Sequence, residues 1–411
     1  MRADTLHILR CPFCGGRLSV VDSLPHRRDG DDIVEATLGC HCCVFPVVAG
    51  IPVLHLEPEA KRAQDQMKAG DAAAAKRTLL GVDGERSERF ETAAGTAGAT
   101  YRELVEALGP GFEGGYFLYR FSDPTFLVAD AVVRAVAAAV PPRTRRSLDL
   151  CGGSGHLTRS LIGSPAAPIL ADLHFSKLWL ARRFTAPGCE AVCCDANAPL
   201  PFEDAAFDLA VCSDAFHYVW TKRLFASEMM RLAGRAGAIA VTHAHNALQW
   251  NPSAGMPLPP DAYADLFAPM SPRLFAEARL LHDVVETGMV DLSRRDDPAA
   301  LEADPALTIV ASLHDEVFRR QPPDRIPGRV RGDLRINPLY AARSEGGGLA
   351  LRLAFPSPDY EDEYGACRDY LPADAAVDRA VLDALADGRV TPEVEALIRR
   401  RVILDVPKGY F

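Results

Sequence analysis

The fold is decided by the stretch Leu148-Asp149-Leu150-Cys151-Gly152-Gly153-Ser154-Gly155-His156-Leu157-Thr158. Its apolar beginning predicts the end of a β-strand, its glycines a tight turn, and its last residues the start of a helix. Glycines in such a turn let a ligand approach the backbone where an open parallel sheet binds its ligands. A single glycine-rich turn is a weak sign of such a site, because any sharp strand-to-helix turn can have this composition.

Acidic residues at the ends of successive strands strengthen this interpretation. Asp149 lies in the first strand, Asp172 ends the second and Asp195 ends the third. A carboxylate at the second position can accept hydrogen bonds from both hydroxyls of a ribose, and one at the third can face an adenine amino group. We therefore expect a nucleoside-containing cofactor here. The turn lacks the G-x-G-x-x-G register of dinucleotide loops, which disfavours NAD.

Short apolar runs typical of strands alternate with helical patterns through the middle of the chain. This alternation predicts an α/β fold, a Rossmann-like doubly wound parallel sheet with helices on both faces. Residues 247–411 break the rhythm and predict an α+β addition, with a glycine-turned hairpin near 334–355 and helices near 373–386 and 391–402. The expected strands are 147–150, 168–171, 190–194, 207–212 and 238–242, and the expected helices are 155–163, 175–184 and 221–233.

Further motifs connect this region with a known family. Leu200-Pro201-Phe202-Glu203-Asp204 precedes the fourth strand, and Glu228-Met229-Met230-Arg231-Leu232 precedes the fifth. From about 145 to 245 the chain resembles the class I S-adenosylmethionine-dependent methyltransferases. The resemblance implies that Asp149 and the turn hold the methionine end of the cofactor, Asp172 the ribose and Asp195 the adenine. The expected cofactor residues are Asp149, Cys151, Gly153, Gly155, Asp172, Asp195, Ala196 and Ser213.

One residue departs from the family pattern. The family usually has glycine at the position of Cys151. A cysteine fits there if its φ angle stays negative, because only glycine adopts positive φ without steric cost. The departure leaves open a weaker affinity for the cofactor, or a domain that has lost catalysis.

Five of the eleven cysteines lie within the first 43 residues. Cys11 and Cys14 form one C-x2-C pair, and Cys40 and Cys43 form a second after 25 intervening residues. Two such pairs can present four thiolates to a tetrahedral structural Zn²⁺, which would supply the folding energy that a module of roughly 50 residues lacks. Cys42 and His41 are alternative fourth ligands, and reduced core cysteines are the alternative to a metal site.

The residues around these cysteines resemble a second family. The segments Leu9-Arg10-Cys11-Pro12, Leu38-Gly39-Cys40 and 45–54 are similar to those of zinc-ribbon proteins that bind and activate methyltransferases. The resemblance covers about residues 5–56. The same ribbon occurs fused to methyltransferases, including one that modifies a guanine of ribosomal RNA.

Residues after the fourth and fifth strands are expected to face the transferred methyl group, because ligands lie outside the carboxyl ends of parallel strands. Methyl transfer depends mainly on alignment, and a base is needed only where the acceptor loses a proton. His217, His243 and His245 are the candidate bases. Each can equally be a structural residue, and a metal role for the last two is a further alternative. In a regular strand the rings of His243 and His245 point to the same side.

An aromatic and basic stretch precedes the first strand. Tyr116, Tyr119 and Arg120 lie where this fold often places a lid over the cofactor, and a packed cluster that caps a helix is the alternative. Two charge runs, Glu361-Asp362-Glu363 and Arg399-Arg400-Arg401, are most simply solvated faces.

Composition narrows the functional classes. The 411 residues include 45 Lys and Arg against 55 Asp and Glu, and no apolar run approaches the roughly 18 residues of a membrane span. We therefore expect a cytoplasmic protein with neither a signal peptide nor a membrane partner. The formal net charge of −10 disfavours a large nucleic-acid surface, although a local basic patch remains compatible with it.

Three functions follow from these patterns. The first is methyl transfer to a small molecule, such as a specialised metabolite in a biosynthesis route, which the acidic chain and its large C-terminal addition favour. The second is an RNA base methyltransferase whose ribbon binds RNA, and the third is a non-catalytic scaffold that activates a partner. The expected domains are a zinc ribbon at 1–56, a helical connector and lid at 57–140, the cofactor-binding core at 141–260 and a C-terminal extension at 261–411 that completes the sheet and covers the substrate site.

Overall fold

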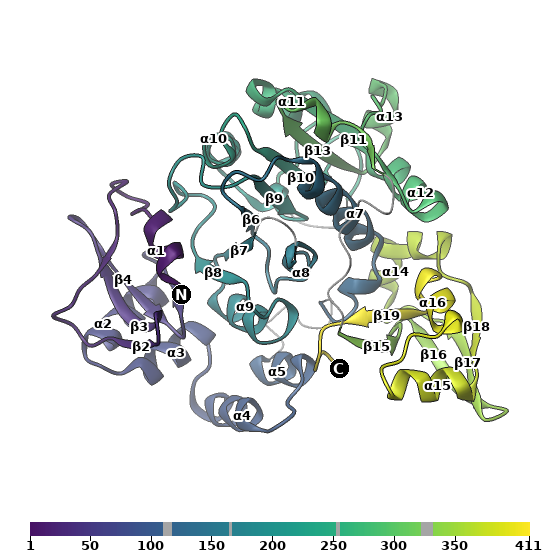
Figure 1. Cartoon of the computed structure of the whole chain (residues 1–411), viewed down its shortest axis with the longest axis horizontal. Coiled ribbons are helices and arrows are strands. Elements are labelled where there is room, and N and C mark those ends of the chain that lie inside the picture. The colour runs from purple at the N-terminus through teal and green to yellow at the C-terminus, as the bar shows by residue number, and fades with distance from the viewer. Residues whose placement is uncertain (110–116, 164–166, 252–254, 322–331) are drawn as a thin grey trace.

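The computed structural model describes residues 1–109, 117–163, 167–251, 255–321 and 332–411 (Figure 1). A seven-stranded sheet with the order β11-β13-β10-β9-β6-β7-β8 forms its centre. Strands β6 to β10 run parallel and β13 runs antiparallel to β10, which confirms the expected α/β fold. The strands are β6 Arg146–Leu150, β7 Ala167–Asp172, β8 Glu190–Cys193, β9 Leu209–Ser213, β10 Ala238–His245, β11 Pro272–Ala276 and β13 Ala306–Ser312.

Helices cover both faces of this sheet because successive side chains of each strand point to opposite faces, and apolar side chains lie on both. Leu148 and Leu150 of β6 pack in the core that contains α10, whereas Leu209 and Val211 of β9 pack in the core that contains α7. The strand order reverses between β6 and β9, so the ligand-binding switch point lies at their carboxyl ends. The covering helices are α7 Pro124–Ala139, α8 Thr158–Leu161, α9 Phe175–Leu180, α10 Lys222–Ala233, α11 Pro260–Phe267, α12 Glu277–Thr287 and α13 Pro298–Ala303.

The cysteine-rich segment is built onto the edge of the sheet at β8. Val53 forms a parallel bridge with Cys193, and the Leu54 amide donates to the Cys193 carbonyl at 2.7 Å. Residues of this segment, such as Phe45, share one hydrophobic core with Val192 of β8. The segment therefore covers a strand edge that would otherwise be exposed. Its elements are α1 Ala3–Ile8, β1 Ser19–Val20, β2 Arg27–Asp29, β3 Asp32–Gly39, β4 Val44–Val48 and β5 Ile51–Pro52.

A helical connector leads from this segment to the sheet. Its helices are α2 Pro58–Lys68, α3 Ala72–Leu80, α4 Gly84–Gly95 and α5 Tyr101–Leu108. Thr100 and Glu103 form a capping box that fixes the start of α5. The chain end returns to this helix, because the ring of Tyr410 stacks on that of Tyr101 with 4.8 Å between centroids.

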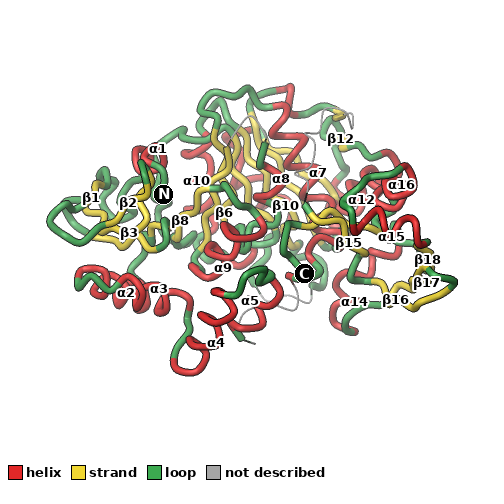
Figure 2. Tube along the Cα trace, turned by 60° about the horizontal axis from the view of Figure 1, so that its bottom comes forward, coloured by secondary structure: helices red, strands yellow, loops and turns green. Residues whose placement is uncertain are grey.

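The C-terminal part of the chain contributes to two structural units. Strands β11 and β13 complete the central sheet, while later residues form a separate core on the side of the sheet opposite the cysteine-rich segment (Figures 1 and 2). The predicted hairpin is confirmed as β16 and β17, which turn at Gly346 and Gly347 with positive φ. The remaining elements are β12 Val290–Asp291, β14 Arg320–Gln321, β15 Asp333–Ile336, β16 Tyr340–Glu345, β17 Gly348–Leu353, α14 Pro358–Tyr364, β18 Asp374–Val377, α15 Arg379–Ala386, α16 Pro392–Arg399 and β19 Ile403–Val406. Across the described residues, no helix has the length and apolarity needed to cross a membrane.

Candidate active site

A cavity of about 620 Å³ opens at the carboxyl ends of the parallel strands. Ligand pockets commonly measure about 300–1,000 Å³, so this volume is adequate for a cofactor and a small second molecule. Every residue that the sequence predicts for the cofactor lines this cavity except Gly155. A Cβ at Gly155 would lie 2.9 Å from that of Ala181, so this glycine serves close packing between the turn and a helix.

Asp149 offers an unsatisfied acceptor at the base of the cavity. Its Oδ2 accepts a hydrogen bond from Thr158 Oγ1 at 2.6 Å, whereas Oδ1 is buried and has no partner among the described residues. Burial raises the pKa of Asp149 to about 7. A buried acceptor without a partner is costly, and an ammonium group in the cavity would satisfy it. The methionine end of S-adenosylmethionine carries such a group, so the residue fits this cofactor.

Asp172 ties the glycine-rich turn to the end of β7. Its Oδ2 accepts a hydrogen bond from the Gly153 amide at 2.9 Å, and its Oδ1 accepts one from the His174 amide at 2.8 Å. A carboxylate has about four acceptor positions, so both oxygens retain capacity for ribose hydroxyls. Asp195 and Ala196 line the cavity beyond the next strand, as the expected adenine site requires.

Cys151 adopts the backbone conformation that the sequence argument required it to avoid. Its φ is +55°, in the left-handed region, so the condition under which cysteine would replace glycine without strain is not met. The turn requires a positive φ at this position whichever amino acid occupies it. For a residue with a side chain, this conformation costs roughly 1–2 kcal/mol. Cys151 therefore stores strain beside the cofactor site.

The strain at Cys151 gives a stability prediction. We expect Cys151→Gly to unfold with a free energy about 1 kcal/mol higher than Cys151→Ala, because both variants lose the thiol and only glycine relieves the positive φ. Urea unfolding of the two variants without cofactor measures the difference. Equal stabilities would contradict a left-handed conformation at this position.

Charged residues from three distant parts of the chain form the other end of the cavity. Arg120 lies 3.0 Å from Asp214 Oδ2 and 3.3 Å from Asp123 Oδ2, measured from its Nη1. Arg120, Asp214 and Glu363 all line the cavity. Glu363 accepts a hydrogen bond from Tyr364 Oη at 2.7 Å, and burial raises its pKa.

The expected lid is only partly formed by the residues that the sequence singled out. Tyr116 lies outside the described residues. Tyr119 packs against the Tyr360 ring at 5.5 Å, as in the packed-cluster alternative, while Arg120 lines the cavity. Phe117 also lines the cavity and lies parallel to the ring of His156 at 5.5 Å.

Both charge runs that were expected to be solvated contain a residue that turns inward. Glu361 and Asp362 are exposed, but Glu363 is half-buried at the cavity. Arg401 is buried and its Nη2 donates to the Phe121 carbonyl. The expectation is therefore wrong for the last residue of each run, because helix and strand ends of the C-terminal unit face the central domain there.

The three candidate bases form one cluster beside the cavity. The rings of His217 and His245 stack with 3.6 Å between centroids, and those of His243 and His245 meet edge to face at 5.2 Å. The described residues that line the cavity do not include these histidines, whereas Asp214, which contacts them, does line it. The strand is not regular there, since β10 shifts register against β13 between Val241 and Ala244.

The protonation of these histidines differs. Burial lowers the pKa of His217 to about 4 and that of His245 to about 3, so both are neutral at pH 7. Burial also opposes the charged form of His243, but the carboxylates of Glu277 and Asp214 outweigh it and raise its pKa to about 9. Sequence reasoning missed Glu277, whose Oε2 accepts a hydrogen bond from His243 Nδ1, because no local motif connects residues 34 positions apart.

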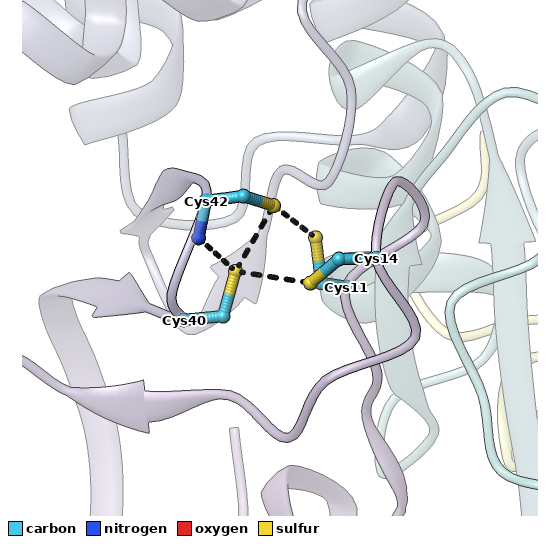
Figure 3. Close-up of side chains that lie close together, drawn as sticks. All are labelled: Cys11, Cys14, Cys40 and Cys42. Carbon is cyan, nitrogen blue, oxygen red and sulfur yellow. Dashed lines mark hydrogen bonds between the residues drawn. The ribbon is translucent and has the colours of Figure 1, made fainter.

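Four cysteine thiols converge in the N-terminal segment (Figure 3). The Sγ of Cys42 lies 3.6 Å from those of Cys11 and Cys40, and Cys14 Sγ lies 3.7 Å from Cys40 Sγ. A tetrahedral zinc site with Zn–S bonds of 2.3 Å places its sulfurs about 3.8 Å apart, so these four thiols fit the ion. Cys42 occupies the place that the C-x2-C symmetry assigned to Cys43, whose Sγ is 3.4 Å from that of Cys42.

Comparisons with known proteins identify the central sheet. The model of the methyltransferase domain family matches residues 148–237. Comparison with curated proteins returns no match. Solved structures with similar parts include a TehB-like SAM-dependent methyltransferase of Corynebacterium glutamicum (14% identity, TM-score 0.33, 45% of this chain and 86% of that one). A second is a complex of a Haloferax volcanii methyltransferase activator with a methyltransferase (16% identity, TM-score 0.33, 45% and 90%).

A third is a Haemonchus contortus phosphoethanolamine N-methyltransferase bound to S-adenosylhomocysteine (15% identity, TM-score 0.30, 41% of this chain and 48% of that one). These identities and TM-scores are low, so we take neither an acceptor nor a partner from them. The family match is different, because it begins in the strand whose glycine-rich turn borders the cavity and ends just before β10. Residues 148–237, which include strand β9 and most of its neighbour β6, are therefore a methyltransferase domain, and the central sheet has the fold of the class I S-adenosylmethionine-dependent methyltransferases.

Proposed function

We propose that this enzyme transfers the methyl group of S-adenosylmethionine to a small molecule held at the Arg120, Asp214 and Glu363 end of the cavity. The observation that supports it most is the composition of this end, where a guanidinium and two carboxylates share one cavity with the strand-end acids. The cofactor supplies an electrophilic methyl carbon on its sulfonium. Asp149, Asp172 and Asp195 would hold the cofactor, and the three charged residues would orient the acceptor.

The origin of these residues favours a small acceptor. Arg120 precedes the central sheet, Asp214 follows β9, and Glu363 belongs to α14 of the C-terminal unit. A site assembled from three separate segments around one cavity is typical of small-molecule pockets with a few placed polar groups. Glu363 can accept a hydrogen bond or a proton from an acceptor hydroxyl or amine.

We further propose that the N-terminal segment is a zinc ribbon that serves the methyltransferase domain of its own chain. Two contacts support this role. The Arg10 amide donates to the Pro201 carbonyl at 2.9 Å, within the segment that follows β8, and the Glu203 amide donates to the Ile8 carbonyl at 2.9 Å. The ribbon thereby holds the chain that passes from the adenine end of the site toward β9.

A labelled-methyl assay tests the choice of acceptor. The full chain is first titrated with S-adenosylmethionine by calorimetry, and is then incubated with methyl-labelled cofactor and either a pool of small metabolites or total RNA. We expect binding and label in the small-molecule fraction, with a strong loss of transfer in Arg120→Ala. Label in RNA alone would favour the ribbon as an RNA-binding element, and the absence of cofactor binding would favour a scaffold.

A further inference from the structure

Three side chains with metal-binding atoms converge at the acceptor end of the cavity. Asp214 directly follows β9, and His243 and His245 lie at the carboxyl end of the strand β10. One ligand atom from each lies within 4.8 Å of the other two, and His245 Nε2 is 3.9 Å from Asp214 Oδ1. Two imidazoles with one carboxylate are a ligand set that divalent transition metals accept.

The backbone is distorted at two of these three positions. Asp214 has φ +52° and His243 has φ +53°, both in the left-handed region. The register shift of β10 against β13 spans the same residues as the strained His243. Such conformations cost roughly 1–3 kcal/mol each, and they gather at sites where side-chain direction matters more than local stability.

Neighbouring side chains orient the three groups. The carboxylate of Glu277 accepts a hydrogen bond from His243 Nδ1, which leaves Nε2 as the ring nitrogen available to an ion. Thr308 Oγ1 donates to the other oxygen of Glu277 at 3.1 Å and fixes it. Arg120 pairs with Asp214 Oδ2, so that Oδ1 is the oxygen facing His245. A carboxylate behind a histidine is the usual outer support of a metal ligand.

His217 packs against this cluster and holds the ring of His245 in place. Its side chain is buried, with 1% of the residue exposed, and neither ring nitrogen has a hydrogen-bond partner among the described residues. Its ring lies flat on that of His245. Leaving buried polar atoms unpaired costs about 1–3 kcal/mol, so the packing that holds His217 flat against the ring of His245 has a cost in stability.

We propose that Asp214, His243 and His245 bind a divalent transition-metal ion, of the zinc type, beside the acceptor. Three protein ligands leave a fourth position of a tetrahedral ion open, as in catalytic zinc sites. Because Asp214 lines the cavity, that position would be available to water or to an oxygen or nitrogen of the acceptor. The proposal rests on the proposed function only for what occupies the fourth position.

Zinc content of the full chain tests this site. After equilibration with excess Zn²⁺ and removal of free metal, we expect two zinc ions per chain, one at the cysteine cluster and one at this triad. His245→Gln should retain one, while His282→Gln, a matched change at an exposed histidine of α12, should retain two. Asp214→Asn is the second variant if His245→Gln fails to fold. A wild-type content of one, or two ions in both triad variants, would overturn the proposal.

Cobalt and cofactor titrations separate this proposal from the others. Co²⁺ at the cysteines gives a strong thiolate charge-transfer band, and Co²⁺ at the triad gives weaker visible bands without it. We expect His245→Gln to lose only the weaker bands; loss of the thiolate band in this variant, or weaker bands absent from the wild type, would overturn the triad site. S-adenosylmethionine titration of the wild-type chain tests the proposed function separately, because it reports on the cofactor site and not on the metal content.

Discussion

The Cys11→Ser/Cys14→Ser variant is expected to lose the zinc of the ribbon and to unfold the ribbon together with the adjoining edge of the sheet. Binding of structural zinc contributes roughly 10–16 kcal/mol in small zinc domains, whereas whole domains are stable by only about 5–15 kcal/mol. The loss reaches the sheet because Leu9 and Phe45 of the ribbon pack in the same core as Val192 of β8. Zinc content and urea unfolding followed by circular dichroism measure both effects.

Two single variants sharpen this prediction. Cys42→Ser should release the metal, because Cys42 Sγ lies 3.6 Å from two thiols of the cluster, whereas Cys43→Ser should retain it. Cys40 belongs to both candidate ligand sets; burial opposes its ionisation, but backbone hydrogen bonds from Cys42 and Cys43 prevail and lower its pKa to about 7. Zinc retained by Cys42→Ser and lost by Cys43→Ser would restore the symmetric set of two C-x2-C pairs.

The choice between these two cysteines shows where sequence patterns stop. The spacing correctly predicts that the turn between β3 and β4, which carries the second cysteine pair, lies next to the first pair. It cannot decide between neighbours on one turn. That choice depends on the direction of each Cα–Cβ bond, and in the structure the thiol of Cys42, not that of Cys43, lies within the cluster with Cys11.

The cofactor end of the cavity could be predicted because its signals are local. The turn after Leu150 and the acids Asp172 and Asp195 follow from strand ends, and strand ends follow from composition. The acceptor end could be predicted only in part, because Arg120 was expected over the cofactor whereas Glu363 comes from a helix of the C-terminal unit. No periodicity in the sequence connects that helix with β9, and its charge run has the composition of a solvated face.

Strain was equally hidden from the sequence. Three residues at the carboxyl ends of central strands have a positive φ although none is a glycine: Cys151, Asp214 and His243. Glycine would mark such positions in the sequence, whereas a cysteine, an aspartate or a histidine does not. Three strained residues at the carboxyl ends of the neighbouring strands β6, β9 and β10 indicate that the chain trades stability for the direction of side chains there.

Asp172→Ala is expected to give the largest loss of cofactor affinity among single substitutions at the strand ends. The change removes the acceptor proposed for both ribose hydroxyls and also leaves the amides of Gly153 and His174 without their partner. Unpaired buried polar groups cost about 1–3 kcal/mol, which corresponds to a roughly 5- to 150-fold rise in the Kd for S-adenosylmethionine. Calorimetric titration of the folded variant measures this rise.

The loss of cofactor affinity should be specific to this carboxylate. The substitution should also loosen the glycine-rich turn. Asp362→Ala, which removes an exposed acid with the same charge, is the matched control and should bind the cofactor like the wild type. In Asp172→Ala the amide of Gly153 should exchange with solvent faster, because its hydrogen bond to Oδ2 is gone. An unchanged Kd in a folded Asp172→Ala variant would place the ribose elsewhere. Faster exchange at Gly153 with that unchanged Kd would show that Asp172 only braces the turn.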